Sequence, residues 1–384
     1  MTRTAGASAR RAAAAAWLAL TAACGGDRPT GSSGGGPPPV PALRGADISA
    51  LERIEQAGGA FKDSGRVGDA VTIMRAHGSN TFRLRLFVNP DYSEVQVNDL
   101  DYTARMAPRI KAAGATLLLD IHYSDTWADP AHQITPAAWA TLALDSLEQQ
   151  VERYTAGVMA RLARAGALPD IVQVGNEVDA GMLWPLGELH YDSDSLPSWD
   201  RFTRLLKAAI RGVRDSLPPG AAVRVMVHYS QGANAGGTQW FFDHVNARGV
   251  DYDLIGLSYY PWWHGTLAEV AGNLQATAQR YGRDIMVVET AYPWRAGGWE
   301  GMVTNAGAMT WPATPQGQAQ FLRSLATAVA VTPGGHGLGV LWWYPESIQV
   351  PGLFVWGGGS LAWFDDGGNV LEAASVFGSG SEVR

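Results

Sequence analysis

The chain has 384 residues, of which 46% are hydrophobic and 17% charged, so it can bury the core of one large domain or of two ordinary ones. Its formal net charge of −7 becomes −10 without the first 24 residues, which carry three arginines and no acidic residue; such a surface repels phosphate backbones and argues against nucleic acid as a partner. The 15 tryptophans combine an apolar face with a polar edge, which suits ligands such as sugars, although most of them are expected in the core.

Residues 1–24 have the pattern of an export signal, which we leave out of the fold. Arg3, Arg10 and Arg11 give the segment a basic start, and an apolar run of residues 12–23 follows. The sequence therefore predicts an exported protein.

Cys24 is the only cysteine of the chain, so no internal disulfide can form. The segment Leu20–Cys24 (LTAAC) resembles a bacterial lipoprotein processing site, in which the cysteine becomes the lipidated first residue. Thr21 stands where such sites usually have leucine, so simple secretion stays open as the alternative. No later segment is long and apolar enough to span a bilayer, so we expect membrane attachment only through a lipid at Cys24.

Residues 25–42 are predicted to be a disordered linker. They consist of Gly, Ser and Pro with almost no apolar side chains, and such a segment cannot bury enough surface to become ordered. The folded domain is predicted to cover residues 43–384, because no compositional break marks a second domain.

From residue 43 onward, predicted strands and helices alternate. Most helices are closed by a glycine or proline signal, such as His77-Gly78. Eight strands and seven clear helices favour a single (β/α)₈ barrel of the α/β class over a doubly wound sheet, which rarely needs eight strands. The predicted strands cover residues 45–49, 81–88, 116–123, 171–177, 223–230, 254–261, 285–292 and 339–344, and the predicted helices cover residues 68–77, 102–113, 136–165, 199–216, 239–248, 267–281 and 315–331.

Two of the predicted strands deliver a glutamate to their carboxyl ends. One is a β-branched run that ends in Asn176 and Glu177, and the other ends in Glu289. Parallel strands that are buried on both faces bring their last residues to one rim of a barrel, where active sites are built. Two carboxyl groups at one rim are the arrangement that carboxylate-pair chemistry needs. We therefore predict Glu177 and Glu289 as a catalytic pair.

The charges around the two glutamates suggest different roles. Arg83 and Arg85 share one face of their strand, and an arginine inside a barrel must find a carboxylate, which Glu289 or Asp47 can supply. A guanidinium beside Glu289 would keep that carboxylate ionised, as a nucleophile requires. Glu177 has no basic neighbour in its strand and precedes an apolar loop, so burial would raise its pKa and keep it protonated, as a general acid requires.

Other interpretations stay open from the residues alone. Either glutamate could cap a helix, and His122 and His228 could be buried structural histidines. A metal site of Asp120, His122 and Asp125 fits the residue types, but Asp125 lies beyond the strand and no HExxH-like spacing occurs. There is no GxSxG elbow, Walker loop or GxGxxG after a strand. We predict no metal and no cofactor.

Several longer motifs stand out at the strand ends: Gly45–Asp47 (GAD), Arg83–Pro90 (RLRLFVNP), Asp120–Pro130 (DIHYSDTWADP), Gly175–Val178 (GNEV), Gly181–Pro185 (GMLWP) and Val288–Thr290 (VET). Together they resemble the motifs of family 53 of the glycoside hydrolases. The resemblance runs from about Gly45 to Phe377, and its longest motif is unusual enough to be specific. It implies a retaining endo-β-1,4-galactanase on a (β/α)₈ barrel, with the acid/base at strand 4 and the nucleophile at strand 7.

The resemblance implies a role for individual residues. Glu177 would be the acid/base and Glu289 the nucleophile, in agreement with the charges around them, and Asn176 would hold the 2-hydroxyl of the sugar at the cleavage point. The other implied roles are support of the nucleophile by Arg83 and Tyr260, a sugar platform at Trp343, and cleft walls made by His122, Asp125, Trp127 and His228.

The sequence departs from the family's pattern in two places. Trp343 is followed by Tyr344 and Pro345, and Glu346 comes one residue later than the family's Trp-Glu-Pro would place it, so the outer subsites are expected to differ. In loop 291–314, where some bacterial relatives bind calcium, the only carboxylate is that of Glu300, and a hard cation needs several oxygen ligands. We therefore predict no calcium.

The resulting expectation is a monomeric exported enzyme that acts on β-1,4-galactan. Another glycanase of the same clan, such as a mannanase or glucanase, shares the Asn-Glu and Glu geometry; the cleft wall around Trp127, which must accommodate the axial 4-hydroxyl of galactose, would discriminate between them. A non-catalytic surface glycan-binding lipoprotein is a third possibility, but a binding protein has no need of paired carboxylates.

Overall fold

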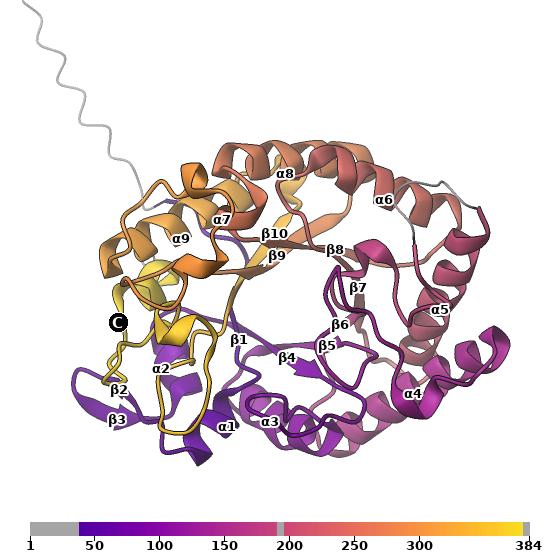
Figure 1. The fold of residues 1–384 in the computed structure, drawn as a ribbon, viewed down its shortest axis with the longest axis horizontal. Helices are drawn as coiled ribbons and strands as arrows, with labels where there is room; N and C mark the ends of the chain where they lie inside the picture. Colours follow the sequence, from indigo (N-terminus) through magenta and orange to yellow (C-terminus); the bar gives the residue numbers. More distant parts are fainter. Residues whose placement is uncertain (1–37, 190–195, 379–384) are drawn as a thin grey trace, which may run out of the picture. The chain divides into compact units, whose positions relative to one another are not determined.

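The structure, a computed structural model, describes residues 38–189 and 196–378. The predicted signal 1–24 with Cys24, and most of the linker 25–42, lie outside these ranges. Within them, eight parallel strands close into a barrel in the order β1-β10-β9-β8-β7-β6-β5-β4. Figure 1 shows these strands as an inner ring with the helices outside it. The predicted (β/α)₈ barrel is confirmed.

Strands and helices alternate along the chain as predicted, and none of the described helices is long and apolar enough to cross a membrane. The barrel strands are β1 (Leu43–Asp47), β4 (Thr81–Leu86), β5 (Thr116–Ile121), β6 (Ile171–Val174), β7 (Arg224–Tyr229), β8 (Leu254–Tyr259), β9 (Asp284–Thr290) and β10 (Gly337–Trp343). The helices are α1 (Leu51–Gln56), α2 (Ala70–Ala76), α3 (Leu100–Ala112), α4 (Leu144–Arg164), α5 (Leu196–Arg214), α6 (Ala235–Ala247), α7 (Pro261–His264), α8 (Leu267–Tyr281) and α9 (Pro315–Ala330).

Side chains on β4 alternate between two environments. Phe82 and Leu86 belong to the large apolar cluster between the barrel and its helices, whereas Arg83 and Arg85 lie on the opposite face, inside the barrel. On the neighbouring strand β5, Arg83 is in register with Leu118 and Arg85 with Asp120. The barrel interior also holds a separate apolar cluster: Leu118, Ile171, Met226, Leu254, Met286, Val288 and Leu341.

Strand β6 ends three residues before the predicted end. Its last residue is Val174, and Gly175 has a φ of +87°, where a Cβ would lie only 2.6 Å from a methyl carbon of Val178. Glu177 is also left-handed, with φ 45° and ψ 56°. The expectation of a strand up to Glu177 is therefore wrong for the last three residues, which leave the ladder and turn into the mouth of the barrel.

The predicted helix 136–165 is interrupted. A 3₁₀ turn (Ala137–Trp139) comes first, and α4 begins only at Leu144. Trp139 is buried with its ring 5.2 Å from that of Tyr154 on α4, so the turn packs back against the helix and cannot continue into it. The other predicted helices are confirmed, with ends that shift by a few residues.

Between β1 and β4 the chain forms two elements that we did not predict. They are α1 and a hairpin of β2 (Phe61–Asp63) and β3 (Arg66–Gly68). Ser64 and Gly65 both have positive φ at the tip, as a two-residue hairpin turn requires. The Ser-Gly pair was a sequence signal for this turn.

Candidate active site

Arg83 lies at the centre of the site and has no exposed surface. Its Nη1 donates to Glu289 Oε1 at 2.9 Å and to Asp47 Oδ2 at 3.3 Å, and its Nη2 donates to Asp120 Oδ2 at 2.7 Å and to Asn176 Oδ1 at 2.8 Å. Both carboxylates expected as partners, those of Glu289 and Asp47, are present. The guanidinium thereby ties the ends of β1, β5, β6 and β9 to β4.

Glu289 is 5% exposed at the carboxyl end of β9 and is held on both oxygens. Arg83 donates to Oε1, and the Tyr260 hydroxyl donates to Oε2 at 3.1 Å. Trp343, at the end of β10, lies beside Arg83, and its ring centroid is 5.4 Å from Arg83 Cζ. The carboxyl group of Glu289 therefore has a single fixed orientation at the barrel mouth.

Glu177 is held through a short relay of hydrogen bonds. Its backbone N–H and the Gln173 amide both donate to His228 Nδ1, at 3.3 and 3.1 Å. Asn176 Oδ1 also lies 3.0 Å from Nδ1, but two donors point at this nitrogen, so we assign the histidine proton to Nε2, which donates to Ser258 Oγ at 3.0 Å. Ser258 Oγ in turn donates to Glu177 Oε1 at 2.6 Å. Burial holds the pKa of His228 well below its usual value, and Arg83 adds to this effect, so the imidazole stays neutral. Oε2 of Glu177 is left for a proton.

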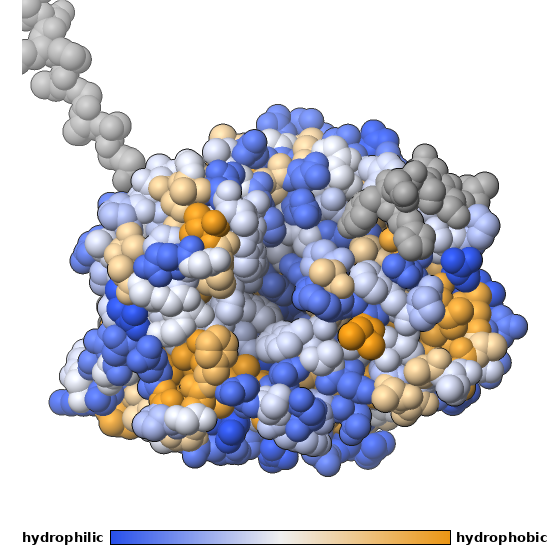
Figure 2. Space-filling view, viewed as in Figure 1, coloured by the Kyte–Doolittle hydropathy of each residue, from blue (hydrophilic) through white to orange (hydrophobic). Residues whose placement is uncertain are grey.

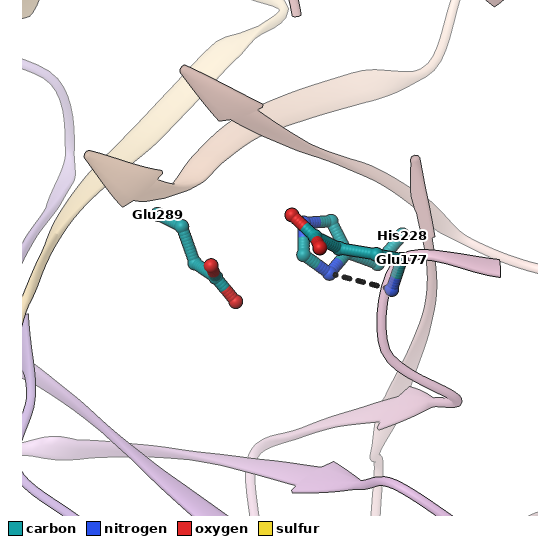
Figure 3. A group of neighbouring side chains, drawn as sticks. All are labelled: Glu177, His228 and Glu289. Carbon is teal, nitrogen blue, oxygen red and sulfur yellow. Dashed lines mark hydrogen bonds between the residues drawn. The ribbon is translucent and has the colours of Figure 1, made fainter. Parts of the chain in front are cut away.

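The two carboxyl groups face each other across the barrel mouth. Figure 3 shows the Glu177 side chain extending toward that of Glu289, with His228 behind Glu177. One carboxylate oxygen of Glu177 and one of Glu289 lie within 4.8 Å of each other. Retaining glycosidases place their carboxyl groups roughly 5–5.5 Å apart, whereas inverting enzymes need roughly 6.5–9.5 Å for a water molecule. An oxygen–oxygen approach within 4.8 Å agrees better with the retaining spacing than with the inverting one.

Burial raises the pKa of both carboxyl groups, but the neighbouring groups that add to or oppose this effect differ. For Glu177 burial and then the nearby Glu289 charge raise the pKa well above its usual value, and the Ser258 hydroxyl opposes them. For Glu289 burial raises the pKa to about 7, although the Arg83 guanidinium lowers it. We expected Arg83 to hold Glu289 ionised, but burial outweighs the guanidinium and the net shift of the Glu289 pKa is upward, so this expectation is wrong. Glu289 still loses its proton before Glu177 does, because the Glu289 charge raises the pKa of Glu177 further.

The raised pKa of Glu177 predicts a stability gain for Glu177→Gln that grows with pH. Below the pKa of the unfolded chain both states are protonated; as pH rises toward the folded-state pKa, only the unfolded state ionises freely, so folding becomes less favourable. Glutamine removes this loss. We expect the wild type and Glu177→Gln to melt at the same temperature near about pH 4. Near about pH 8 the variant should melt higher, by roughly 2–4 °C for each kcal/mol gained in the free energy of unfolding.

Glu300→Gln is the matched control for this measurement. Glu300 is exposed, and backbone N–H groups of its own loop lower its pKa, so its replacement gives no gain at high pH. A Glu177→Gln protein that melts below the wild type at high pH would contradict the assignment of a buried, uncompensated carboxyl group.

The pair opens into a pocket of about 430 Å³, which is within the usual size range of ligand sites. Figure 2 shows a hollow near the centre of this face of the molecule. The walls come from the loops after β4, β5, β6, β8 and β10 and from the carboxyl ends of β9 and β10, and they are rich in aromatic side chains, as a sugar site requires. The lining residues are Glu94, Val95, Gln96, Trp127, Ala128, Asp129, Asn176, Glu177, Tyr260, Trp263, Glu289, Trp343, Tyr344, Phe354 and Trp356.

Three residues expected as cleft walls do not line this pocket. His122 is buried behind Trp127, with its Nδ1 accepting from Ala128 N–H, and His228 is buried behind Glu177. Asp125 turns away, and its Oδ2 accepts from the N–H of Ala137 at 2.8 Å. The resemblance implied a cleft role for all three, but their contacts with neighbouring loops and strands direct their side chains away from this pocket.

Arg85 does not contact Glu289 or Asp47, so its predicted support of the nucleophile is wrong. Its Nη2 donates to Asn98 Oδ1 at 2.9 Å, and its Cζ lies 4.2 Å from the ring centroid of Trp127. Arg85 lies two residues further along β4 than Arg83, and from there its guanidinium does not reach the carboxylates of Glu289 and Asp47. Arg85 instead supports the aromatic wall of the pocket.

The side chains of three residues are close enough to share a metal ion: Glu177, His228 and Glu289. Their hydrogen bonds show whether they are free to bind one. Both ring nitrogens of His228 already take part in hydrogen bonds, to Glu177 N–H and Ser258 Oγ. A metal would have to displace these bonds and the proton on Nε2. The donor set therefore fits a hydrogen-bonded carboxylate pair better than a metal site.

The two departures from the family's motifs have local explanations. Glu346 is fully buried, and its Oε1 accepts from the N–H of Ala50 at 2.9 Å, so it holds the loop after β1 and does not reach the pocket. Tyr344 lines the pocket instead, at a positive φ of 59°. In loop 291–314, Glu300 accepts from the N–H groups of Gly297 and Trp299.

Sequence reasoning missed much of the pocket wall. Asp129, Trp263, Phe354 and Trp356 line it, and none of them was singled out as a site residue. For Trp263 a signal existed, because it follows the strand-end Tyr260 by three residues. For Phe354 and Trp356 no signal existed, since they come from a long irregular segment after β10.

Comparison with known proteins identifies the family of the chain. Residues 43–377 match the model of glycosyl hydrolase family 53. The arabinogalactan endo-beta-1,4-galactanase of Thermothelomyces thermophilus is 34% identical over 349 residues, covering 87% of this chain and 98% of that protein.

Solved structures give the same result. The Ignisphaera aggregans GH53 catalytic domain is 34% identical, with a TM-score of 0.81 over 88% of this chain and 96% of that one. A structure described as one of two fungal beta-1,4-galactanases is 32% identical, with a TM-score of 0.76 over 88% of this chain and 99% of that one. The chain belongs to glycosyl hydrolase family 53.

Proposed function

We propose that the protein is a retaining endo-β-1,4-galactanase that cleaves galactan, the β-1,4-galactose chains of type I arabinogalactan. The observation that carries the proposal is the Glu177 and Glu289 pair, with oxygens within 4.8 Å at the pocket of a family 53 barrel. Relatives that cover nearly the whole domain are named as β-1,4-galactanases, which supports the substrate. Trp127 and Trp343 provide aromatic faces beside the pair.

In the first step Glu289 attacks the anomeric carbon of the sugar as a carboxylate. Arg83 and Tyr260 hold its two oxygens, which limits the reorganisation needed for attack. Glu177 donates its proton to the departing glycosidic oxygen, so a glycosyl enzyme forms at Glu289 and the shortened chain leaves as an alcohol. The buried, raised pKa of Glu177 suits this donation.

In the second step Glu177 acts as a base. Now ionised, it takes a proton from a water molecule, whose oxygen attacks the anomeric carbon and frees Glu289. Two inversions leave the configuration of the sugar unchanged. Ser258 holds Glu177 Oε1 throughout, so Oε2 is the oxygen that carries the proton in both steps.

The proposal predicts rapid release of short oligosaccharides from linear β-1,4-galactan in a reducing-sugar assay. Mannan, β-glucan and β-1,3-galactan serve as parallel substrates, and Glu289→Gln protein serves as the blank. Activity on mannan or β-glucan instead of galactan would favour another glycanase specificity. Binding to a glycan with no hydrolysis of any substrate would favour a non-catalytic glycan-binding protein.

Export, lipid attachment at Cys24 and the monomeric state stay predictions from the sequence. The mass of the N-terminal peptide of the mature protein tests the first two, because a processed lipoprotein begins at a lipidated cysteine. Sedimentation of the purified protein tests the third.

A further inference from the structure

We propose that Gln133 is a positioning residue that holds the backbone of Glu177 in the orientation from which its carboxyl group can transfer a proton. The inference rests on the proposed function, because it assigns Gln133 to the acid/base of that reaction. Gln133 lies in the loop after β5, is 1% exposed, and does not line the pocket.

The backbone at Glu177 needs an external support. Its φ of 45° and ψ of 56° are in the left-handed region, which a residue with a Cβ adopts only when its surroundings impose it. The residue is also beyond the end of β6, so no strand ladder receives its carbonyl group. Because the direction of Cα–Cβ follows from φ and ψ, any relaxation at this position would swing the carboxyl group away from its partner.

The Gln133 amide provides this support directly. Its Nε2 lies 2.8 Å from Asn176 O, 3.2 Å from Glu177 O and 3.1 Å from Asp129 O. One side-chain amide thus serves the carbonyl groups on both sides of Glu177 Cα, and it binds them to the loop after β5. Buried carbonyl groups at a strained position would otherwise lack donors.

Other bonds join the same two loops without contacting Glu177. The backbone of Trp184 donates to Gln133 O at 2.7 Å, and Thr135 Oγ1 donates to Trp184 O at 2.7 Å. The Asn176 side chain donates to Ala128 O at 2.8 Å. Asp129 O also accepts from the N–H of His132 at 3.0 Å, so it keeps a donor without Gln133. Removal of the Gln133 amide should therefore leave the loops together and take the donor away from the Asn176 and Glu177 carbonyl groups.

The test compares Gln133→Met with Thr135→Val on two substrates. Methionine keeps the length and bulk of glutamine but donates no hydrogen bond, whereas Thr135→Val removes a bond between the same loops away from Glu177. The substrates are β-1,4-galactan, whose leaving group needs a proton, and a dinitrophenyl β-1,4-galactobioside, whose leaving group does not. The measured quantity is kcat/KM, which covers the steps up to the glycosyl enzyme.

We expect Gln133→Met to lower kcat/KM about 10- to 100-fold on galactan and less than about threefold on the aryl substrate, because only cleavage of galactan depends on general acid catalysis. Thr135→Val should change both by less than about threefold. The alkaline limb of the galactan pH profile should also shift in Gln133→Met. Equal losses on both substrates, or no loss on either, would overturn the inference.

Two further results separate the possible failures. If Gln133→Met does not fold, as judged by circular dichroism, Gln133→Leu replaces it, since leucine is also apolar and cannot donate a hydrogen bond, and the same split between substrates is expected. If the wild-type protein itself does not hydrolyse galactan, the proposed function fails. If the wild type is active and the split is absent, only the role of Gln133 fails.

Discussion

Replacement of Glu177 and Glu289 by alanine should inactivate the protein in two chemically different ways. Glu177→Ala should lose most of its activity on galactan but still form a glycosyl enzyme from an aryl β-galactobioside with a good leaving group. Added azide should then release the sugar as the β-galactosyl azide, because azide attacks the glycosyl enzyme and needs no general base. Glu289→Ala should lose at least about 10⁴-fold on every substrate, as expected for loss of a nucleophile.

The anomer of the azide product distinguishes the two roles. In Glu289→Ala no glycosyl enzyme can form, so any azide that reacts must enter the space left by the carboxylate and give the α-galactosyl azide. Nuclear magnetic resonance of the products reads out the anomer. Glu300→Ala, which changes an exposed carboxylate in the loop after β9, is the control and should behave as the wild type. A β-azide from Glu289→Ala and none from Glu177→Ala would exchange the assigned roles.

The positions of the two glutamates could be predicted because a buried parallel strand has few ways to end. Runs such as Ile171–Val174 (IVQV) are mostly apolar and buried on both faces, so the polar residues that follow them must lie at the rim. Strand alternation placed Arg83 inside the barrel for the same reason. Its contact with Glu289 followed, since a buried cation requires a carboxylate.

The loops could not be predicted in this way. Arg85 has the same alternation as Arg83, but its partners are Asn98 and Trp127, and no spacing rule relates strand β4 to those loops. Gln133 has an ordinary sequence context, and its importance appears only when its amide is seen beside the Glu177 carbonyl group. The pKa of Glu289 shows the same limit, because the sequence reveals a charged neighbour but not the depth of burial.

Arg83→Met should give the largest loss of stability among the site variants. The substitution leaves the carboxylates of Asp47, Asp120 and Glu289 buried without the guanidinium that now contacts all three. Removal of one partner from a buried ionic cluster costs about 3–5 kcal/mol. We expect a corresponding drop in the midpoint of urea unfolding near neutral pH, together with loss of activity.

Arg85→Met is the matched control, since it removes a second fully buried arginine from the same strand. Among the described residues Arg85 pairs with no carboxylate, so its replacement leaves only the amide oxygen of Asn98 and the carbonyl oxygen of Val95 without this donor, and should cost about 1–3 kcal/mol. Addition of Asp120→Asn to Arg83→Met should recover part of the loss, because it removes one of the uncompensated charges.

The pH dependence decides between charge and packing as the cause. In the wild type, although burial opposes them, Arg83 and His122 hold the pKa of Asp120 below its usual value, so this carboxylate contributes stability above the pKa of the unfolded chain and loses it in acid. Without Arg83 that contribution disappears and the buried carboxylates favour their protonated forms. The difference between wild type and Arg83→Met should therefore shrink as pH falls from about 7 to about 4. An equal difference at both pH values would mean that the volume of the Arg83 side chain, and not its charge, holds the barrel mouth together.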